Sequence, residues 1–341
     1  MLSKIYPVIL LPPTWANSRN NHSIQRTLFL CSAWYDASVI VGVACVLSVV
    51  LFWSFTPVLI KISLEYVDPY TLAFLRLFQG LSLIVILWRK RYGTIRRMLS
   101  FEPLILVGGA GITVNYILFI VALNYTTAGM GGLIVQIQFV TLAALAWLVL
   151  GEPFHLLKLA GILVIVVGVS LVFAQTGTTS QITKSEYVVG NGLMLVAGIG
   201  WGVYAMANKA ISARRSHLEF LAPIFVIATA VSFITSLLNF QIRAPMSIFG
   251  ILAIVILGTV VTGVGFLLMS AGLRRLNASL VGAIAGTTPL FNLLAARWML
   301  NEPLTPIIFL SACVILFGIL SMVQADRLCE NCGSWGGRIS R

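Results

Sequence analysis

Charged residues are scarce in this chain. They make up 9% of its 341 residues, and 59% of the residues are apolar, whereas a soluble domain carries about 25% charge. The mean hydropathy is +0.99. These values exclude an ordinary soluble domain and indicate an integral membrane protein. The net charge of +12 does not indicate a nucleic-acid partner, because the cations lie between apolar runs and follow a topological pattern.

Acidic and histidine side chains are also few. The ten acids and three histidines all lie outside the middle of the apolar runs. A membrane enzyme would need paired carboxylates, a nucleophile with its base, or a metal cluster at membrane depth, and the sequence offers none of these. Proton-driven carriers commonly use a buried carboxylate or histidine. Proton coupling therefore has no support, and exchange and facilitated movement are equally open.

The five cysteines do not form a disulfide framework. Cys45 and Cys313 lie inside apolar runs, and Cys31 stands alone. Cys329 and Cys332 form a CxxC pair near the C-terminal end, but no second pair completes a zinc site. We therefore expect no metal and no cofactor, and the sequence gives the CxxC pair no role.

Long apolar runs are what the chain has in abundance. In lipid, backbone polar groups must be paired within their own segment, so each run of roughly 20 residues is expected to be a membrane-spanning helix. Residues 1–38 precede the runs as a polar tail, a targeting segment or an unused start; 175–187 form a linker and 325–341 a C-terminal tail. The ten runs cover residues 39–60, 69–88, 103–123, 127–150, 154–174, 188–211, 218–239, 247–271, 278–300 and 304–324.

The chain repeats itself. Glu152-Pro153, just before the fifth run, returns 150 residues later as Glu302-Pro303, just before the tenth. Such self-similarity indicates two copies of one unit, here residues 39–174 and 188–324. Five helices per copy is an odd number, so the second copy must enter the membrane upside down. The expected fold is all-α and integral to the membrane, with ten transmembrane helices in two inverted five-helix repeats.

The positive residues predict the orientation. Of the 22 lysines and arginines, 17 fall on the side of both tails and the even-numbered loops, four fall on the other side, and Arg76 lies inside a run. Cytoplasmic loops carry such an excess, so both termini are expected in the cytoplasm of an inner or plasma membrane.

Inverted repeats are the architecture of alternating-access transporters, whose substrate site lies near the midplane between the copies. The expected function is secondary transport of a small organic molecule. The competing reading is a polytopic membrane enzyme acting on a lipid or another membrane substrate. The expected partners are a small-molecule substrate and membrane lipids, without nucleic acid, and a homodimer stays open.

Several motifs sharpen this expectation. The segment from Trp53 to Pro57, Asp68-Pro69, Phe74-Leu-Arg76, Glu152-Pro153 and Thr288-Pro289 resemble those of the drug/metabolite transporter superfamily, in its ten-helix EamA-type branch. The resemblance covers residues 39–324. It implies that helices 1–4 and 6–9 line a central cavity, with the fifth helix of each copy peripheral. It also implies amino acids, nucleosides, sugar-type metabolites or drugs as substrates, often exported. Phe139 departs from the pattern, because it stands where the second copy has Pro289, and leaves open whether the fourth helix kinks.

Arg76 is the sharpest candidate for substrate contact. It lies seven residues into its helix, where a charge is costly and usually faces a cavity or a partner. The alternative is that it snorkels to the headgroups, only about 10 Å away at 1.5 Å per residue. Trp201, Tyr204 and Asn208 fall on one helix face. Aromatic rings and an amide suit an organic substrate, and helix packing is an equal alternative.

Polar residues in the other runs complete the candidate site. Asn115 lies in mid-membrane and needs a partner. Gln136 and Gln138 are two residues apart, so only one is expected to face the cavity squarely. Glu152 and Glu302 are expected to mark the repeat, with their proline neighbours, as carboxylates near the positive end of a helix dipole. The expected substrate-binding set is Trp53, Thr56, Arg76, Asn115, Gln136, Trp201, Tyr204, Asn208, Thr288 and Asn292.

Overall fold

The computed structural model describes residues 21–93, 98, 102–152, 155–175, 183–212, 214–276 and 278–339. Pro153, residues 1–20 and residues 176–182 of the expected linker lie outside the described residues, as do the side chains of Cys31, Cys329 and Cys332. The chain divides into two units, residues 1–41 and 42–341. The account below concerns the second unit.

Within the described residues, ten helical segments are long and apolar enough to cross a membrane. The chain is therefore an all-α multi-pass membrane protein, and each segment overlaps one of the ten runs expected from the sequence. The ten segments are Ser38–Leu64, Pro69–Tyr92, Pro103–Ala122, Ala128–Leu150, Leu156–Phe173, Lys184–Ile211, His217–Asn239, Ile248–Leu273, Leu280–Leu300 and Pro306–Asp326.

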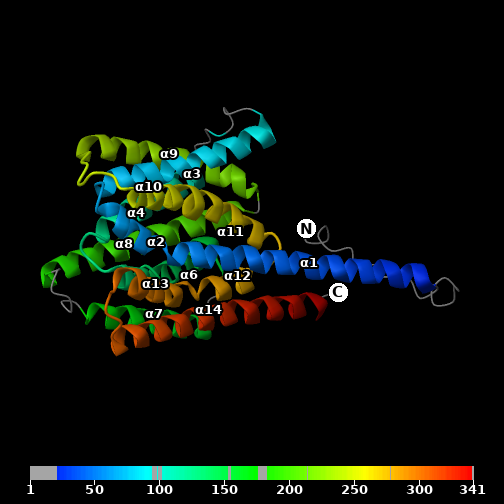
Figure 1. Ribbon diagram of the computed structural model, residues 1–341. Coiled ribbons are helices and arrows are strands. Elements are labelled where there is room, and N and C mark those ends of the chain that lie inside the picture. Colours follow the sequence, from blue (N-terminus) through cyan, green and yellow to red (C-terminus); the bar gives the residue numbers. More distant parts are fainter. Residues whose placement is uncertain are drawn as a thin grey trace. The chain divides into compact units, whose positions relative to one another are not determined.

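Several segments consist of more than one helix (Figure 1). The first repeat contains α1 (Asn21–Ser54), α2 (Thr56–Leu64), α3 (Pro69–Tyr92), α4 (Pro103–Ala122), α5 (Ala128–Ile134), α6 (Ile137–Leu150) and α7 (Leu156–Phe173). The second contains α8 (Lys184–Ile211), α9 (His217–Asn239), α10 (Ile248–Val255), the π-helix η3 (Ile256–Val264), α11 (Gly265–Leu273), α12 (Ala278–Ala285), α13 (Thr288–Leu300) and α14 (Pro306–Ile339).

Helix ends follow from local sequence. Asp68 accepts hydrogen bonds from the backbone N–H groups of Tyr70 and Thr71, both at 2.9 Å, and so caps α3. At the C-terminal end of α6, Gly151 has φ 67°, and at the matching end of α13, Asn301 has φ 52°. These are the residue types that adopt the left-handed conformation most readily. The repeat thus preserves the way in which its fourth helix ends.

The fourth helix of each repeat is broken in mid-membrane. The interruptions fall between α5 and α6 and between α12 and α13. Pro289 lies just after the second break, whereas the first has no proline nearby. At the first break the backbone N–H of Gln136 donates to Leu133, three residues back. The side-chain amide of Gln136 donates instead to the carbonyl of Gly132, at 2.9 Å. A side chain thus satisfies a carbonyl near the break, and both fourth helices are interrupted.

The most extensive packing joins helices of different repeats: α4 with α8, α7 with α14, and α3 with α9. In Figure 1, α7 and α14 lie side by side, as do α3 and α9. The contact of α4 with α8 depends on Gly111 and Gly200. A Cβ atom on Gly200 would lie 2.7 Å from the carbonyl oxygen of Gly111, and one on Gly111 would lie 2.6 Å from that of Gly200. The inverted repeats therefore interlock at the centre of the bundle.

Candidate functional site: a central cavity and its vestibule

A cavity of about 100 Å³ lies between the two repeats. Its walls come from the middle of broken or locally altered helices, where α1 meets α2, α5 meets α6 and α12 meets α13, and from α3, α4, α8 and α11. It is lined by Trp53, Thr56, Pro57, Arg76, Asn115, Tyr116, Phe119, Gly132, Val135, Gln136, Gln138, Trp201, Phe266, Thr288 and Asn292.

Arg76 is the one charged side chain among these lining residues, and only 6% of it is exposed. Its Nε donates a hydrogen bond to the hydroxyl of Thr262 at 2.8 Å, and its guanidinium lies 4.4 Å from the centroid of the Tyr116 ring. The snorkelling alternative is therefore wrong for this side chain. Among the described residues, Arg76 forms no ion pair with an acid.

The π-helix η3 positions the partner of Arg76. The Thr262 hydroxyl donates to the carbonyl of Leu257, five residues earlier, at 3.0 Å. The wide turn of a π-helix brings these residues together, and such turns are frequent at functional sites. Because its proton is used in this bond, the Thr262 oxygen can accept from Arg76.

Aromatic rings form another wall of the cavity. The rings of Trp53 and Trp201 are 5.5 Å apart, edge to face at 85°, and Phe266 lies within 6 Å of both. The Trp53 indole N–H donates to the carbonyl of Val261 at 3.3 Å. Edge-to-face rings give a rigid apolar surface on which the body of an organic molecule can pack.

Among the described residues that line the cavity, Asn292 has a polar side-chain atom that is buried and unpaired. Its side-chain N–H donates to the carbonyl of Ser54 at 3.0 Å, whereas its Oδ1 is buried and has no hydrogen-bond partner among the described residues. Oδ1 faces Gly132, where a Cβ atom would collide with it. Buried acceptors without a partner are rare in proteins, and Asn292 is one of the residues that line the cavity.

Most of the remaining polar side chains of the cavity form hydrogen bonds within the protein. Asn115 donates to the carbonyl of Ala197 on α8, at 2.9 Å, which gives it the partner that its depth demands. The hydroxyls of Thr56 and Thr288 bond to carbonyls of the preceding turn. Gln138 donates to the side-chain carbonyl of Gln136 at 3.2 Å.

The sequence predicts that only one of these glutamines faces the cavity squarely. Gln136 and Gln138 both line it, because Gln136 lies at the break between α5 and α6. The angular spacing of a continuous helix does not hold across that break.

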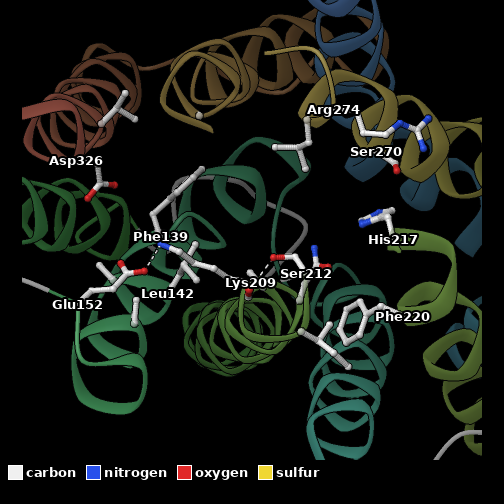
Figure 2. Close-up of a pocket in the computed structure, with 18 of the residues that line it drawn as sticks. Phe139, Leu142, Glu152, Lys209, Ser212, His217, Phe220, Ser270, Arg274 and Asp326 are labelled. Carbon is white, nitrogen blue, oxygen red and sulfur yellow. Dashed lines mark hydrogen bonds and ion pairs between the residues drawn. The ribbon is translucent and has the colours of Figure 1, made fainter. Parts of the chain in front are cut away.

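A larger pocket of about 1060 Å³, here called the vestibule, is shown in Figure 2. Gln138 and Trp201 line the cavity. Phe139, the residue after Gln138, and Ala205, about one turn after Trp201, line the vestibule. Asn208 also lies in the vestibule. The charged side chains of the vestibule wall are mainly cationic, although three of them pair with acids, and the excess of positive charge favours anions. The charged lining residues are Arg91, Lys158, Lys209, Arg215 and Arg274, with Glu152 and Asp326.

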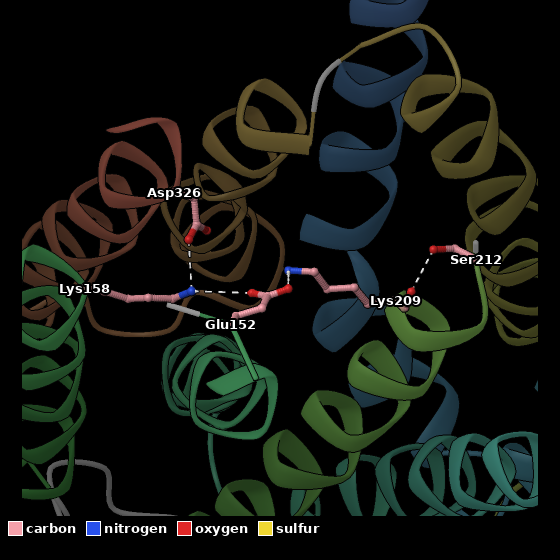
Figure 3. A network of polar contacts seen from close by, with 5 residues as sticks. All are labelled: Glu152, Lys158, Lys209, Ser212 and Asp326. Carbon is pink, nitrogen blue, oxygen red and sulfur yellow. Dashed lines mark hydrogen bonds and ion pairs between the residues drawn. The ribbon is translucent and has the colours of Figure 1, made fainter. Parts of the chain in front are cut away.

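An ion-pair network crosses one wall of the vestibule (Figure 3). Lys158 is almost fully buried and lies 2.9 Å from Asp326 but 3.9 Å from Glu152. The other carboxylate oxygen of Glu152 lies 2.6 Å from Lys209, whose side chain is half exposed. Asp326 is thus the principal partner of the buried lysine, and Glu152 the principal partner of Lys209.

At the opposite end of the bundle, Glu302 joins the end of α13 to the start of α5. Its two carboxylate oxygens accept hydrogen bonds from the backbone N–H groups of Ala128, at 2.6 Å, and Gly129, at 2.8 Å. These N–H groups begin α5, so the positive end of a helix meets the carboxylate. The helix belongs to the other repeat and is not the fifth helix that follows Glu302. Arg297 lies at this end, exposed, and donates to the carbonyl of Glu302 at 3.5 Å.

Eight of the ten residues selected from the sequence line the cavity. Tyr204 is buried behind it and packs 5.2 Å from the Trp201 ring, and Asn208 lines the vestibule. Sequence reasoning missed Tyr116 and Phe266 as lining residues, and Thr262 as the partner of Arg76. A hydroxyl within the apolar run 247–271 was the available signal for Thr262.

The model of the EamA-like transporter family matches residues 40–174 and 188–324, once for each repeat. The curated relatives include an uncharacterized inner membrane transporter of Escherichia coli K12, YhbE, which is 25% identical over 315 residues, 87% of this chain and 94% of its own length. A probable amino-acid metabolite efflux pump of the same strain is 27% identical over 288 residues, 80% of this chain and 91% of its own.

A relative from Archaeoglobus fulgidus, named as an uncharacterized transporter, is 27% identical over 259 residues, 74% of this chain and 86% of its own. A solved structure, titled only as the crystal structure of a protein, superposes with a TM-score of 0.63 at 20% identity. It covers 85% of this chain and 99% of its own length. This likeness concerns the fold alone.

Proposed function

Because this chain belongs to the EamA-like transporter family, and is a membrane transporter, we propose that it moves a small organic solute with an anionic group through the central cavity. The names of the family and of its relatives point to transport and not to the alternative of a membrane enzyme. The observation that carries the proposal is the buried Arg76 without an acidic partner among the described residues.

A buried cation without an anion is costly, by several kcal/mol even after relaxation. Thr262 and Tyr116 offset part of that cost, but only one of the five guanidinium N–H donors is used in the bond to Thr262. A carboxylate on the solute would accept from the remaining donors in a bidentate pair. The cationic vestibule supports the same conclusion, since it raises the local concentration of anions.

Two further features limit the solute. The free Oδ1 of Asn292 calls for a hydrogen-bond donor, and the rings of Trp53 and Trp201 for an apolar body. An amino acid meets all three requirements, whereas a sugar or an unphosphorylated nucleoside lacks the anion. The name of one relative, a probable amino-acid metabolite efflux pump, agrees with this assignment.

The mechanism we propose is alternating access. The vestibule leads to one face, and Glu302 closes the other. The distribution of positive residues supports a cytoplasmic position of the vestibule, and on that orientation we propose an inward-facing state of an exporter or exchanger. A reporter fused after Asp326 is expected to be cytoplasmic. A signal from the outer side would contradict this orientation.

Counterflow in proteoliposomes tests the proposed function. Vesicles with the purified chain, preloaded with an unlabelled amino acid, are expected to accumulate the same amino acid in labelled form. Its methyl ester, which lacks the anion, should neither exchange nor compete. Exchange of the ester at the same rate would overturn the anionic assignment, and no exchange across amino acids, nucleotides and other organic acids would overturn the transport proposal.

A further inference from the structure

We propose that Glu152 and Glu302 form a reciprocal gate. In the state described here, Glu302 caps α5 of the other repeat and closes its end, while Glu152 pairs with Lys209 at the open end. In the opposite state the roles are exchanged: Glu152 caps the beginning of α12, and Glu302 leaves α5 to form a direct ion pair with Lys61, with which it already interacts electrostatically. Both glutamates act as positioning residues, since neither lines the central cavity.

The repeat places an equivalent of the glutamate, of the helix start and of the exposed lysine at the other end of the bundle. Glu152 matches Glu302, and Ala128 at the start of α5 matches Ala278 at the start of α12, each 150 residues apart. Lys61 matches Lys209 at an offset of 148. Two inverted copies of one unit can exchange conformations, and this exchange turns an inward-open molecule into an outward-open one.

The backbone around the two glutamates has the same form, although their side chains do not. The N–H of Glu152 donates to the carbonyl of Ala146 at 3.2 Å, and the N–H of Glu302 donates to that of Ala296 at 3.3 Å. These acceptors are again 150 residues apart. The repeats therefore hold both glutamates on identical turns, and the difference lies in what each carboxylate contacts.

The contacts of Glu302 suit a closed gate. Two short hydrogen bonds to backbone N–H groups at a helix start are charge-assisted and fix α13 to α5. The cluster around them is apolar and buried. It contains Val58, Ala128, Ala295 and Ala296.

The contacts of Glu152 suit a gate that is ready to close. Its nearest partner, Lys209, is half exposed, so water can replace the carboxylate when Glu152 leaves. Its second partner, Lys158, is buried but retains Asp326 at 2.9 Å. Asp326, near the middle of α14, thus keeps the buried lysine of the first repeat paired in both states. Exchange of the two glutamates conserves one capped helix and one ion pair, which lets the states interconvert.

The reactivity of a cysteine placed at the closed end measures the equilibrium between the two states. Ala296 is 1% exposed and lies at the closed end, so Ala296→Cys is expected to react with a maleimide only when that end opens. The purified full-length chain, with its five native cysteines replaced, serves as the parent in detergent. Glu302→Gln weakens the cap at the closed end and should raise the labelling rate about tenfold.

The Glu152 variant distinguishes a reciprocal gate from a local destabilisation of the closed end. Glu152→Gln weakens the cap of the opposite state, so it should lower the labelling rate below that of the parent. The double variant should return close to the parental rate, because both states lose one cap. Glu65→Gln, at an exposed acid of the same end, should leave the rate unchanged.

Two outcomes would overturn the proposal. One is a Glu152→Gln variant that labels at the parental rate. The other is a double variant that labels as fast as Glu302→Gln alone, since Glu302 would then only stabilise its own end. Neither outcome depends on the solute, so the gate can fail while the proposed transport of an anion stands.

Discussion

Arg76→Gln is expected to abolish transport of anionic solutes while the folded protein remains. Loss of a bidentate, charge-assisted pair weakens solute binding by about 100-fold. The same change removes a buried cation that has no acidic partner among the described residues, so stability should be unchanged or higher. A buried charge that does not stabilise the fold is expected where the residue binds a solute.

Counterflow and thermal unfolding of the same preparation measure both effects. Arg76→Lys keeps the charge but loses the planar fork and the stacking on Tyr116, so it should recover only part of the transport. Arg275→Gln, at an exposed arginine outside both the cavity and the vestibule, is the matched control. Normal transport by Arg76→Gln would remove Arg76 from the solute site.

Gly200→Leu should have the largest effect on the fold. Its Cβ atom would lie 2.7 Å from the carbonyl oxygen of Gly111 and 3.1 Å from the backbone nitrogen of Asn115. Backbone cannot move aside as a flexible side chain can, so α4 and α8 would be forced apart. We expect a loss of about 3 kcal/mol or more, seen as a lower unfolding temperature and less monodisperse protein in detergent.

The same helix provides the control. A Cβ atom on Gly192 would meet nothing within 4 Å, so Gly192→Leu should leave the unfolding temperature nearly unchanged. If both variants behave alike, the helix is sensitive to leucine as such, and the close contact of Gly111 with Gly200 is not what holds the repeats together.

The sequence was sufficient to predict the ten spans and their inverted arrangement. Long apolar runs and the 150-residue offset depend only on order along the chain, and lipid leaves helices as the one solution for such runs. The depth of Arg76 likewise identified it as a candidate, because a charge in that position is costly in any arrangement.

Contacts between distant residues could not be predicted in this way. Thr262 meets Arg76 because η3 is a π-helix, and nothing in its sequence distinguishes that winding from an α-helix. Gln136 and Gln138 face the same cavity because of a break without proline. The partner of Glu302 lies 174 residues away in the chain, at the start of α5. Each of these contacts depends on where helices meet in space. A single sequence does not record such a meeting unless the same contact occurs in both repeats.

The most direct test of this account is an experimental structure of the chain with a transported carboxylate bound. We predict that the carboxylate oxygens lie within hydrogen-bond distance of the Arg76 guanidinium, with the donor of the solute facing Oδ1 of Asn292 and its body against Trp53 and Trp201. A solute held in the vestibule with the central cavity empty, or one bound in the cavity with its carboxylate turned away from Arg76, would contradict it.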